Sequence, residues 1–195
     1  MRKRIKTGIY GGSFNPIHNG HTQLAEFLCR EGYVDELWFL VSPQNPFKQS
    51  ANDLLDDQAR LELARLAIKE NSNLHVSDFE FTLPRPSYTY KTLRALRQTY
   101  PDREFLLVIG ADNWQAFDRW AEPEEIRAHQ QILVYPRTGY PLDPLQLPEQ
   151  VTAVPSPIID LSSTELRKAI HDGLDASYGL NPDVLKEILA RGYYQ

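Results

Sequence analysis

The residues best suited to chemistry lie near the N-terminus, in the run GIYGGSFNPIHNGH at positions 8–21. Gly11 and Gly12 carry no side chains, so backbone N–H groups at this turn can approach phosphate oxygens. His18 and His21 are three residues apart and can share one face of a helix start. Such a start adds unpaired N–H donors and a partial positive charge. The run therefore predicts an anion site made of a strand, a glycine turn and a helix.

Two other interpretations of the histidine pair stay open. Histidines at positions i and i+3 can chelate a metal ion, although zinc requires a further ligand such as a carboxylate, and none lies nearby in the sequence. The pair could also be a surface feature of a helix start. Phosphate contact is favoured because the glycines lie immediately upstream. The run is neither a GxGxxG fingerprint nor a Walker A loop, since no Gly-Lys-Ser/Thr follows.

The elements that would position this run alternate between strands and helices. The apolar patterns predict strands over residues 4–10, 36–42, 74–78, 104–110 and 131–135, and helices over 19–31, 57–70, 88–99, 123–129, from 162 onward, and 182–191. This alternation predicts an α/β fold, a Rossmann-like doubly wound parallel sheet with helices on both faces. Ser87, Asp112 and Ser162 are candidate helix N-caps, and Glu165 stands at the capping-box spacing from Ser162.

A proline-rich stretch interrupts the alternation. Six prolines fall between residues 136 and 157. Proline lacks the backbone donor that helices and sheet ladders need. The stretch therefore predicts a long surface excursion with no helix and at most one short strand, near residues 151–154.

In sheets of this kind, ligands lie beyond the carboxyl ends of the strands, at the point where strand order reverses. Four segments of interest follow predicted strands and should meet at one rim. They are GGSFNPIHNGH (11–21), SPQNPFK (42–48), GADNW (110–114) and LSSTELR (161–167).

Length and composition set further limits. A chain of 195 residues predicts a single domain over 1–195, and its net charge of −5 argues against a general nucleic-acid binder. No apolar run approaches the roughly 20 residues that span a bilayer, so no membrane association is expected. The single cysteine, Cys29, allows no intrachain disulfide, which fits a reducing, cytoplasmic setting.

The pattern resembles the (H/T)xGH nucleotidylyltransferase superfamily and, within it, bacterial nicotinate-nucleotide adenylyltransferase. The resemblance covers nearly the whole chain. Residues 18–21 form the HxGH signature and residues 162–167 resemble the second signature, an (S/T)xxR-type helix start. Further matches occur in order along the chain, at Lys48, Arg60, residues 86–89, residues 110–112 and Trp120.

This resemblance implies that ATP and nicotinate mononucleotide react to give nicotinate adenine dinucleotide and pyrophosphate, by in-line attack without a covalent intermediate. The nucleophile is a phosphate monoester with a second pKa of about 6, so it is largely a dianion at neutral pH and needs no general base. Catalysis should then consist of positioning and electrostatic stabilisation. Mg²⁺ is expected with ATP, held through phosphate oxygens and water.

The resemblance also implies a set of site residues. His18, His21 and Arg167 would be catalytic. The ATP-binding set would be Gly11, Gly12, Ser13, Phe14, His18, His21, Gly110, Asp112, Ser163, Thr164 and Arg167. The mononucleotide-binding set would be Asn15, Lys48, Tyr88, Thr89, Asp112 and Trp120. Backbone near Ile109-Gly110 and the segment before Ser162 are expected at the adenine.

Within these sets, Trp120 would stack on the pyridine ring and Lys48 would meet the mononucleotide phosphate. Asp112 would contact ribose hydroxyls. The Thr89 hydroxyl and backbone donors near Tyr88 would favour a carboxylate over an amide. The proline-rich stretch does not map onto the family residue by residue.

Rival functions come from two classes. One is another enzyme of the superfamily, acting on nicotinamide mononucleotide, pantetheine phosphate or glycerol phosphate. The other is a nucleotide sensor that binds without turnover, which the presence of both signatures disfavours. A metal-binding protein built on the histidine pair is a weaker option. The chain could be a monomer or a homo-oligomer.

Overall fold

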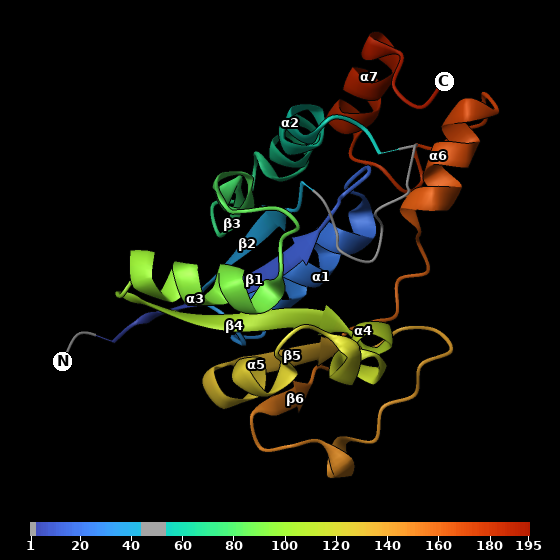
Figure 1. The fold of residues 1–195 in the computed structure, drawn as a ribbon. Coiled ribbons are helices and arrows are strands. Elements are labelled where there is room, and N and C mark those ends of the chain that lie inside the picture. The colour runs from blue at the N-terminus through green and yellow to red at the C-terminus, as the bar shows by residue number, and fades with distance from the viewer. Residues whose placement is uncertain (1–2, 44–53) are drawn as a thin grey trace.

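The structure is a computed structural model that describes residues 3–43 and 54–195. Six parallel strands form one sheet in the order β3-β2-β1-β4-β5-β6. Their bounds are β1 Ile5–Gly12, β2 Glu36–Val41, β3 Leu74–Ser77, β4 Arg103–Gly110, β5 Gln131–Tyr135 and β6 Val151–Ala153. The strand order reverses between β1 and β4, which lie side by side at the centre (Figure 1). The carboxyl ends of these two strands therefore form the switch point at which such sheets bind ligands.

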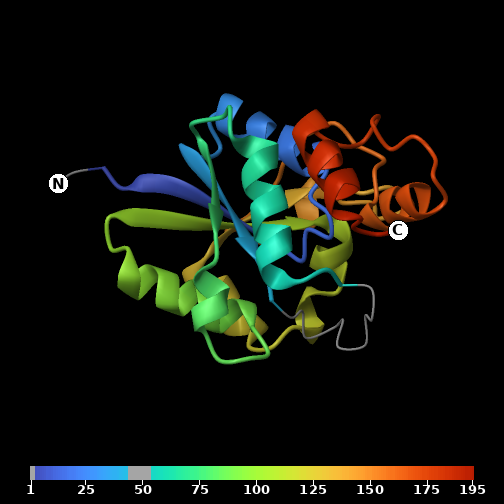
Figure 2. The same ribbon diagram turned by 90° about the horizontal axis from the view of Figure 1, so that it is seen from above.

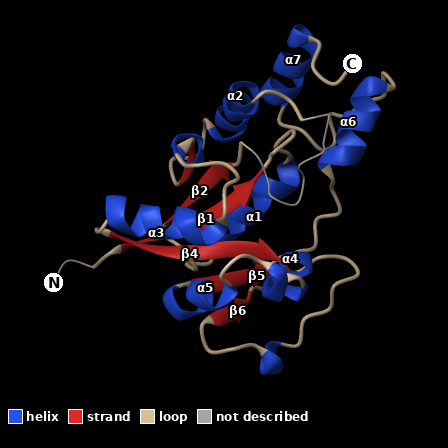
Figure 3. Ribbon diagram, viewed as in Figure 1, coloured by secondary structure: helices blue, strands red, loops and turns tan. Residues whose placement is uncertain are grey.

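Helices cover both faces of the sheet, as Figure 2 shows from above. Their bounds are α1 Asn19–Arg30, α2 Asp57–Ile68, α3 Thr89–Thr99, α4 Ala111–Gln115, α5 Pro123–His129, α6 Ser163–His171 and α7 Pro182–Arg191. Three short 3₁₀ helices span Phe79–Thr82, Phe117–Arg119 and Pro144–Gln146. Figure 3 shows how the helices alternate with the strands. The predicted Rossmann-like parallel α/β fold is thus confirmed.

Two apolar clusters follow from the alternation of side chains along the strands. One face of the sheet, with Phe39 and Val108, packs against Leu28 of α1 and Leu61 of α2. The other face, with Ile109, packs against α3 and α5. Because both faces are covered, the central strands are near-continuous apolar runs, which is why residues 104–110 gave a strong strand pattern.

A third apolar cluster holds the last two helices against α2. Leu63 of α2 packs with Leu166 of α6 and with Val184 and Ile188 of α7. This packing sets the first turn of α6 beside the loop that follows β1, where Ser163 Oγ donates to the carbonyl of Pro16 at 2.9 Å. Segments 147 residues apart in sequence therefore share one edge of the sheet.

Two predicted helix caps are wrong. Tyr88, rather than Ser87, is the N-cap residue of α3, and no side chain caps that helix. The hydroxyl of Ser87 is instead buried at the cavity described below. Gly110 is the N-cap of α4, which places Asp112 inside the first turn. Ser162 is confirmed as a cap, since its hydroxyl accepts the N–H of Glu165 at 3.1 Å.

The proline-rich stretch forms the long excursion that its composition predicts. It contains the short strand β6 and one 3₁₀ turn. Within residues 3–43 and 54–195, no helix is long and apolar enough to cross a bilayer.

Candidate active site

A cavity of about 900 Å³ opens at the carboxyl ends of β1 and β4. Every predicted site residue in the described part of the chain lines it, whereas Lys48 lies outside the described residues. The lining residues that the sequence predicted are Gly11, Gly12, Ser13, Phe14, Asn15, His18, His21, Tyr88, Thr89, Gly110, Asp112, Trp120, Ser163, Thr164 and Arg167. The fold thus gathers four separate segments around one space large enough for a nucleotide.

The two histidines stand at the first turn of α1, where His18 is the N-cap residue and His21 is the third residue of the helix. Their rings stack, with centroids 3.6 Å apart and an interplanar angle of 24°. The backbone N–H of His18 donates to Nδ1 of His21 at 3.2 Å. Since Nδ1 accepts this bond, a neutral His21 ring must carry its proton on Nε2. Phe14 packs edge-on against the His21 ring at 5.1 Å and fixes its orientation.

Both histidines are held neutral in the free protein. Burial lowers the pKa of His18 to about 4, and the nearby positive charge of Arg137 adds to that shift. Burial also lowers the pKa of His21 well below its usual value, with contributions from His18 and Arg137. At neutral pH the pair therefore offers N–H donors rather than fixed positive charge.

Two arginines hold the loop between β1 and α1 through hydrogen bonds to backbone carbonyls. Arg60 of α2 is fully buried, and its Nη1 donates to the carbonyls of Ser13 and, at 3.1 Å, Ser42. Arg167 of α6 donates Nη1 to the carbonyl of Asn15 at 2.9 Å. Carbonyls that are engaged in this way are turned toward the arginines and away from an anion in the cavity.

The first turn of α6 presents two backbone donors to the cavity. Ser162 caps the N–H of Glu165, so the N–H groups of Ser163 and Thr164 are the remaining donors of that turn. Both residues line the cavity. A helix N-terminus of this kind attracts phosphate through its donors and its dipole.

The far end of the cavity is formed by the uncapped start of α3. Tyr88 and Thr89 line it. The Tyr88 and Tyr90 rings lie with their centroids 6.2 Å apart, and Nζ of Lys91 lies 5.4 Å from the centroid of the Tyr88 ring. The Tyr88 side chain therefore packs against neighbouring residues rather than facing a ligand. Glu80, which the sequence analysis did not single out, lies at this end with 6% of its surface exposed. Burial raises the pKa of Glu80, which Thr92 opposes by donating its hydroxyl to Oε1 at 2.8 Å.

Trp120 and Asp112 occupy the wall near α4. Trp120 is half-buried and packs on Phe117 at 5.1 Å. Oδ1 of Asp112 lies so close to Gly110 that a β-carbon at position 110 would stand 2.3 Å from it. A side chain at position 110 would therefore displace the Asp112 carboxylate from its present place in the cavity wall.

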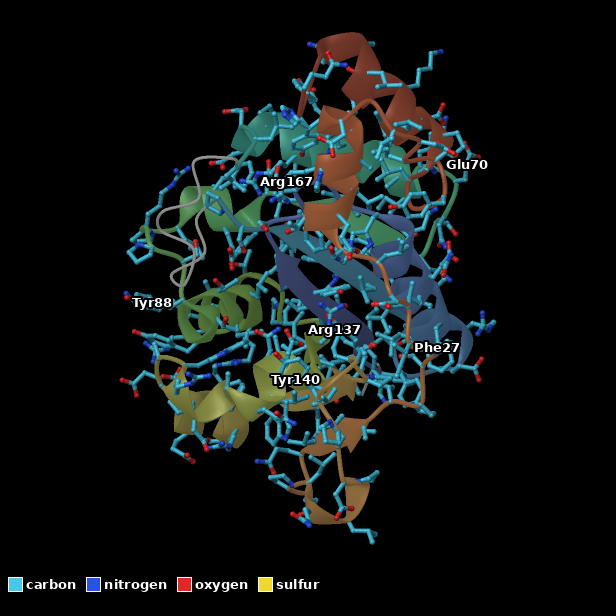
Figure 4. The ribbon with its side chains drawn as sticks, turned by 90° about the vertical axis from the view of Figure 1, so that its right-hand side faces the viewer. Phe27, Glu70, Tyr88, Arg137, Tyr140 and Arg167 are labelled. Carbon is cyan, nitrogen blue, oxygen red and sulfur yellow. The ribbon has the colours of Figure 1, made fainter. Side chains whose placement is uncertain are left out.

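Arg137 is the main cation that sequence reasoning missed. It follows β5 by two residues, and its Nε lies 3.7 Å from Oδ1 of Asp112. Figure 4 looks toward the carboxyl ends of the strands and shows Arg137 and Arg167 on that face. The rule that ligand groups follow strand ends applies to Arg137 as well, but the proline-rich stretch that contains it gave no pattern to place it.

Unsatisfied polar atoms concentrate at this one cavity. Among the described residues, four buried side-chain atoms have no close hydrogen-bond partner, and all four residues line the cavity. These atoms are His18 Nδ1, Glu80 Oε2, Ser87 Oγ and Asp112 Oδ1. Buried polar groups are normally paired, so their gathering here indicates a site that is completed by a polar ligand.

Comparison with known proteins agrees with this geometry. Residues 9–169 match the family model described as cytidylyltransferase-like. A Bacteroides fragilis protein named "Probable nicotinate-nucleotide adenylyltransferase" is 54% identical over 186 residues, which cover 95% of this chain and 92% of the relative. A Bacteroides thetaiotaomicron protein of the same name is 49% identical over 185 residues, covering 95% and 91%.

Among solved structures, Plasmodium falciparum nicotinic acid mononucleotide adenylyltransferase complexed with NaAD matches the fold with a TM-score of 0.82. The identity is 19%, and the match covers 97% of each chain. The level of identity to the curated relatives confirms the resemblance that the two signatures suggested. The chain therefore belongs to the nicotinate-nucleotide adenylyltransferase family and is a nucleotidyltransferase.

Proposed function

We propose that this protein transfers the adenylyl group of ATP to nicotinate mononucleotide, giving nicotinate adenine dinucleotide and pyrophosphate in NAD biosynthesis. The observation that supports this most strongly is a single cavity with phosphate-suited donors at one end and an uncapped helix start at the other. The first end suits a triphosphate, and the second suits a carboxylate. The names of the relatives at 54% and 49% identity support the same reaction.

At the phosphate end, the two histidines and Arg167 are the proposed catalytic groups. The Nε2–H of His21 would donate to a phosphate oxygen, since its Nδ1 is occupied. The N–H groups of Ser163 and Thr164 would hold the β- and γ-phosphates, and the loop from Gly11 to Phe14 would hold the remainder. These fixed donors would stabilise the charge that develops on the departing pyrophosphate.

The substrate form of ATP would carry Mg²⁺. Within the described residues, no three His, Cys, Asp or Glu side chains gather to hold a metal ion. The cavity's hydroxyl, imidazole and guanidinium groups fit an ion held by phosphate oxygens and water.

At the other end, Trp120 would stack on the pyridine ring and Asp112 would accept from ribose hydroxyls. The open N–H groups at the start of α3, with the Thr89 hydroxyl, would bind the nicotinate carboxylate. Asn15, which also lines the cavity, is a further proposed contact of the mononucleotide. Lys48 remains a proposed ligand of the mononucleotide phosphate, on grounds of family resemblance alone.

The chemistry requires no general base. An oxygen of the mononucleotide phosphate, already a dianion, attacks the α-phosphorus of ATP. The bond from that phosphorus to the bridging oxygen of the β-phosphate breaks, and pyrophosphate leaves with the electron pair. The protein's part is to align two polyanions and to offset their repulsion.

Turnover with paired substrates tests this proposal. Pyrophosphate release is measured with ATP and nicotinate mononucleotide, and again with ATP and nicotinamide mononucleotide. We expect the acid to be preferred, because backbone N–H donors bind a carboxylate and leave an amide's N–H₂ unpaired. Equal or better use of the amide would contradict the substrate assignment. Absence of pyrophosphate with both mononucleotides would contradict the enzymatic role.

A further inference from the structure

The penultimate residue of the chain reaches back to the loop that follows β1. The hydroxyl of Tyr194 donates to Oδ1 of Asn15 at 2.8 Å, across 179 positions of sequence. The same Oδ1 accepts the backbone N–H of Leu55 at 3.1 Å, just before α2. Asn15 is 5% exposed, so these two bonds are shielded from water and its side-chain oxygen has a fixed position.

Tyr194 does not line the cavity. Its ring is half-buried in the apolar cluster formed by α2, α6 and α7. This cluster holds the C-terminal helices in place, so the Tyr194 ring that packs against it has a fixed position for its hydroxyl. Among the described contacts, the hydrogen bond to the side chain of Asn15 is the one that links the Tyr194 hydroxyl to a residue lining the cavity.

Three long side chains hold the loop at residues 13–16, in addition to the Ser163 hydroxyl on the Pro16 carbonyl and the Leu55 N–H on the Asn15 side chain. Arg60 binds the Ser13 carbonyl, Arg167 binds the Asn15 carbonyl, and Tyr194 binds the Asn15 side chain. Of these three, only Arg167 also lines the cavity. The three contacts come from α2, α6 and the C-terminal end, which the third apolar cluster packs into one unit.

We propose that Tyr194 is a positioning residue for the loop that follows β1, holding Asn15 and, through it, the adjoining Ser13 and Phe14 in the arrangement that binds the triphosphate of ATP. This inference rests on the proposed function, because it assigns the loop to ATP. Its physical basis is that fixed donors stabilise a transition state only while their geometry is maintained.

Tyr194→Phe tests the inference, because it removes the hydroxyl and keeps the ring in the apolar cluster. The adjacent Tyr193→Phe is the matched control, since Tyr193 packs in the same cluster. We measure kcat and KM for both substrates well below the thermal midpoint of each variant. Loss of one shielded hydrogen bond should lower kcat/KM for ATP about five- to tenfold in Tyr194→Phe, with Tyr193→Phe within about twofold of the wild type.

A second pair of variants separates positioning from general destabilisation. In an Asn15→Ala background the acceptor is gone, so adding Tyr194→Phe should change kcat/KM for ATP by less than about twofold, because coupled residues are not additive. The inference would be overturned by wild-type kinetics in Tyr194→Phe, by equal losses in both tyrosine variants, or by an undiminished effect of Tyr194→Phe in the Asn15→Ala background. An inactive wild type would instead refute the proposed function.

Discussion

Two polar clusters lie at opposite ends of the same sheet, and they are built differently. At the amino end, Oε1 of Glu36 accepts from Thr7, Trp38 and Arg103 at 2.8, 2.9 and 3.0 Å. At the carboxyl end, four buried polar atoms around the cavity make no hydrogen bond to any described residue. The first cluster is hydrogen-bonded within the protein, whereas the second leaves buried polar atoms without a close partner among the described residues.

This difference separates polar groups that maintain the fold from polar groups that bind. A closed cluster such as that of Glu36 joins the starts of β1, β2 and β4 through hydrogen bonds within the protein. An open cluster costs stability, because each buried group has lost water without gaining a bond. Such groups are expected at sites where binding matters more than stability.

The largest expected effect is on turnover at the open cluster. His18→Ala and His21→Ala should each lower kcat by about 10²-fold or more, the scale observed when a preorganised charge-stabilising donor is removed. His75→Ala is the matched control, since His75 lies 3.6 Å from Glu36 at the closed cluster. A wild-type rate in either cavity variant, or an equal loss in His75→Ala, would contradict the proposed difference between the open and closed clusters. Steady-state pyrophosphate release measures all three.

The open cluster should also make stability depend on pH. Burial lowers the pKa of His18 to about 4, below the value of about 6.5 in an unfolded chain. The unfolded state therefore binds more protons between these values, so stability is present above pH 6.5 and is lost as the pH falls toward 4. Between pH 7 and 4.5 the loss from this one group should be about 2 to 3 kcal/mol.

Urea unfolding of the ligand-free protein at the two pH values measures this loss. The His18→Gln variant should show a smaller difference between pH 7 and pH 4.5, by about the same 2 to 3 kcal/mol. An identical pH dependence in the variant and the wild type would show that His18 is not held neutral by the fold.

At the closed cluster, substitution should affect stability and spare turnover. Glu36→Ala removes the shared acceptor of three donors and should lower the free energy of unfolding by about 2 kcal/mol. Its kcat at 25 °C should stay within about twofold of the wild type. Glu31→Ala, which breaks an exposed ion pair with Arg30, should cost less than about 0.5 kcal/mol. A selective loss of activity in Glu36→Ala would contradict the division of roles.

The smallest expected effect is on the binding of the pyridine ring of nicotinate mononucleotide. Trp120→Ala should raise KM for nicotinate mononucleotide about tenfold, with little change in KM for ATP, because stacking contributes on the order of 1–3 kcal/mol. Trp114→Ala is the control, since Trp114 packs on the same Phe117 but does not line the cavity. A selective rise in KM for ATP in Trp120→Ala would contradict the stacking assignment.

The sequence predicted the fold because the strands and long helices have strong periodic patterns. It also predicted that segments far apart would meet at one rim, which follows from parallel strand order alone. The helix α4 was missed because one turn and a half is too short for a periodic pattern. Ser87 suggested a cap by residue type, but the helix starts two residues later and leaves that hydroxyl at the cavity.

Site residues whose positions depend on tertiary contacts were harder to predict from the sequence. Arg137 lies in a stretch without pattern, and its approach to Asp112 comes from the adjacency of β4 and β5. Glu80 lies in a short 3₁₀ helix between a predicted strand and a predicted helix, where no periodic pattern singled it out. Arg60 matched the family, but its burial against the loop between β1 and α1 could not be predicted from the residues next to it in the chain.

The central claim is that nucleotide phosphates complete the open cluster at the carboxyl end, and the titration of His18 tests it most directly. Its pKa is measured by NMR in the free protein, with a non-hydrolysable ATP analogue, and with adenosine, which lacks phosphates. We predict a pKa of about 4 in the free protein, a clear rise with the ATP analogue because phosphate charge favours the protonated imidazole, and no rise with adenosine. An unchanged pKa at saturating ATP analogue would contradict the claim.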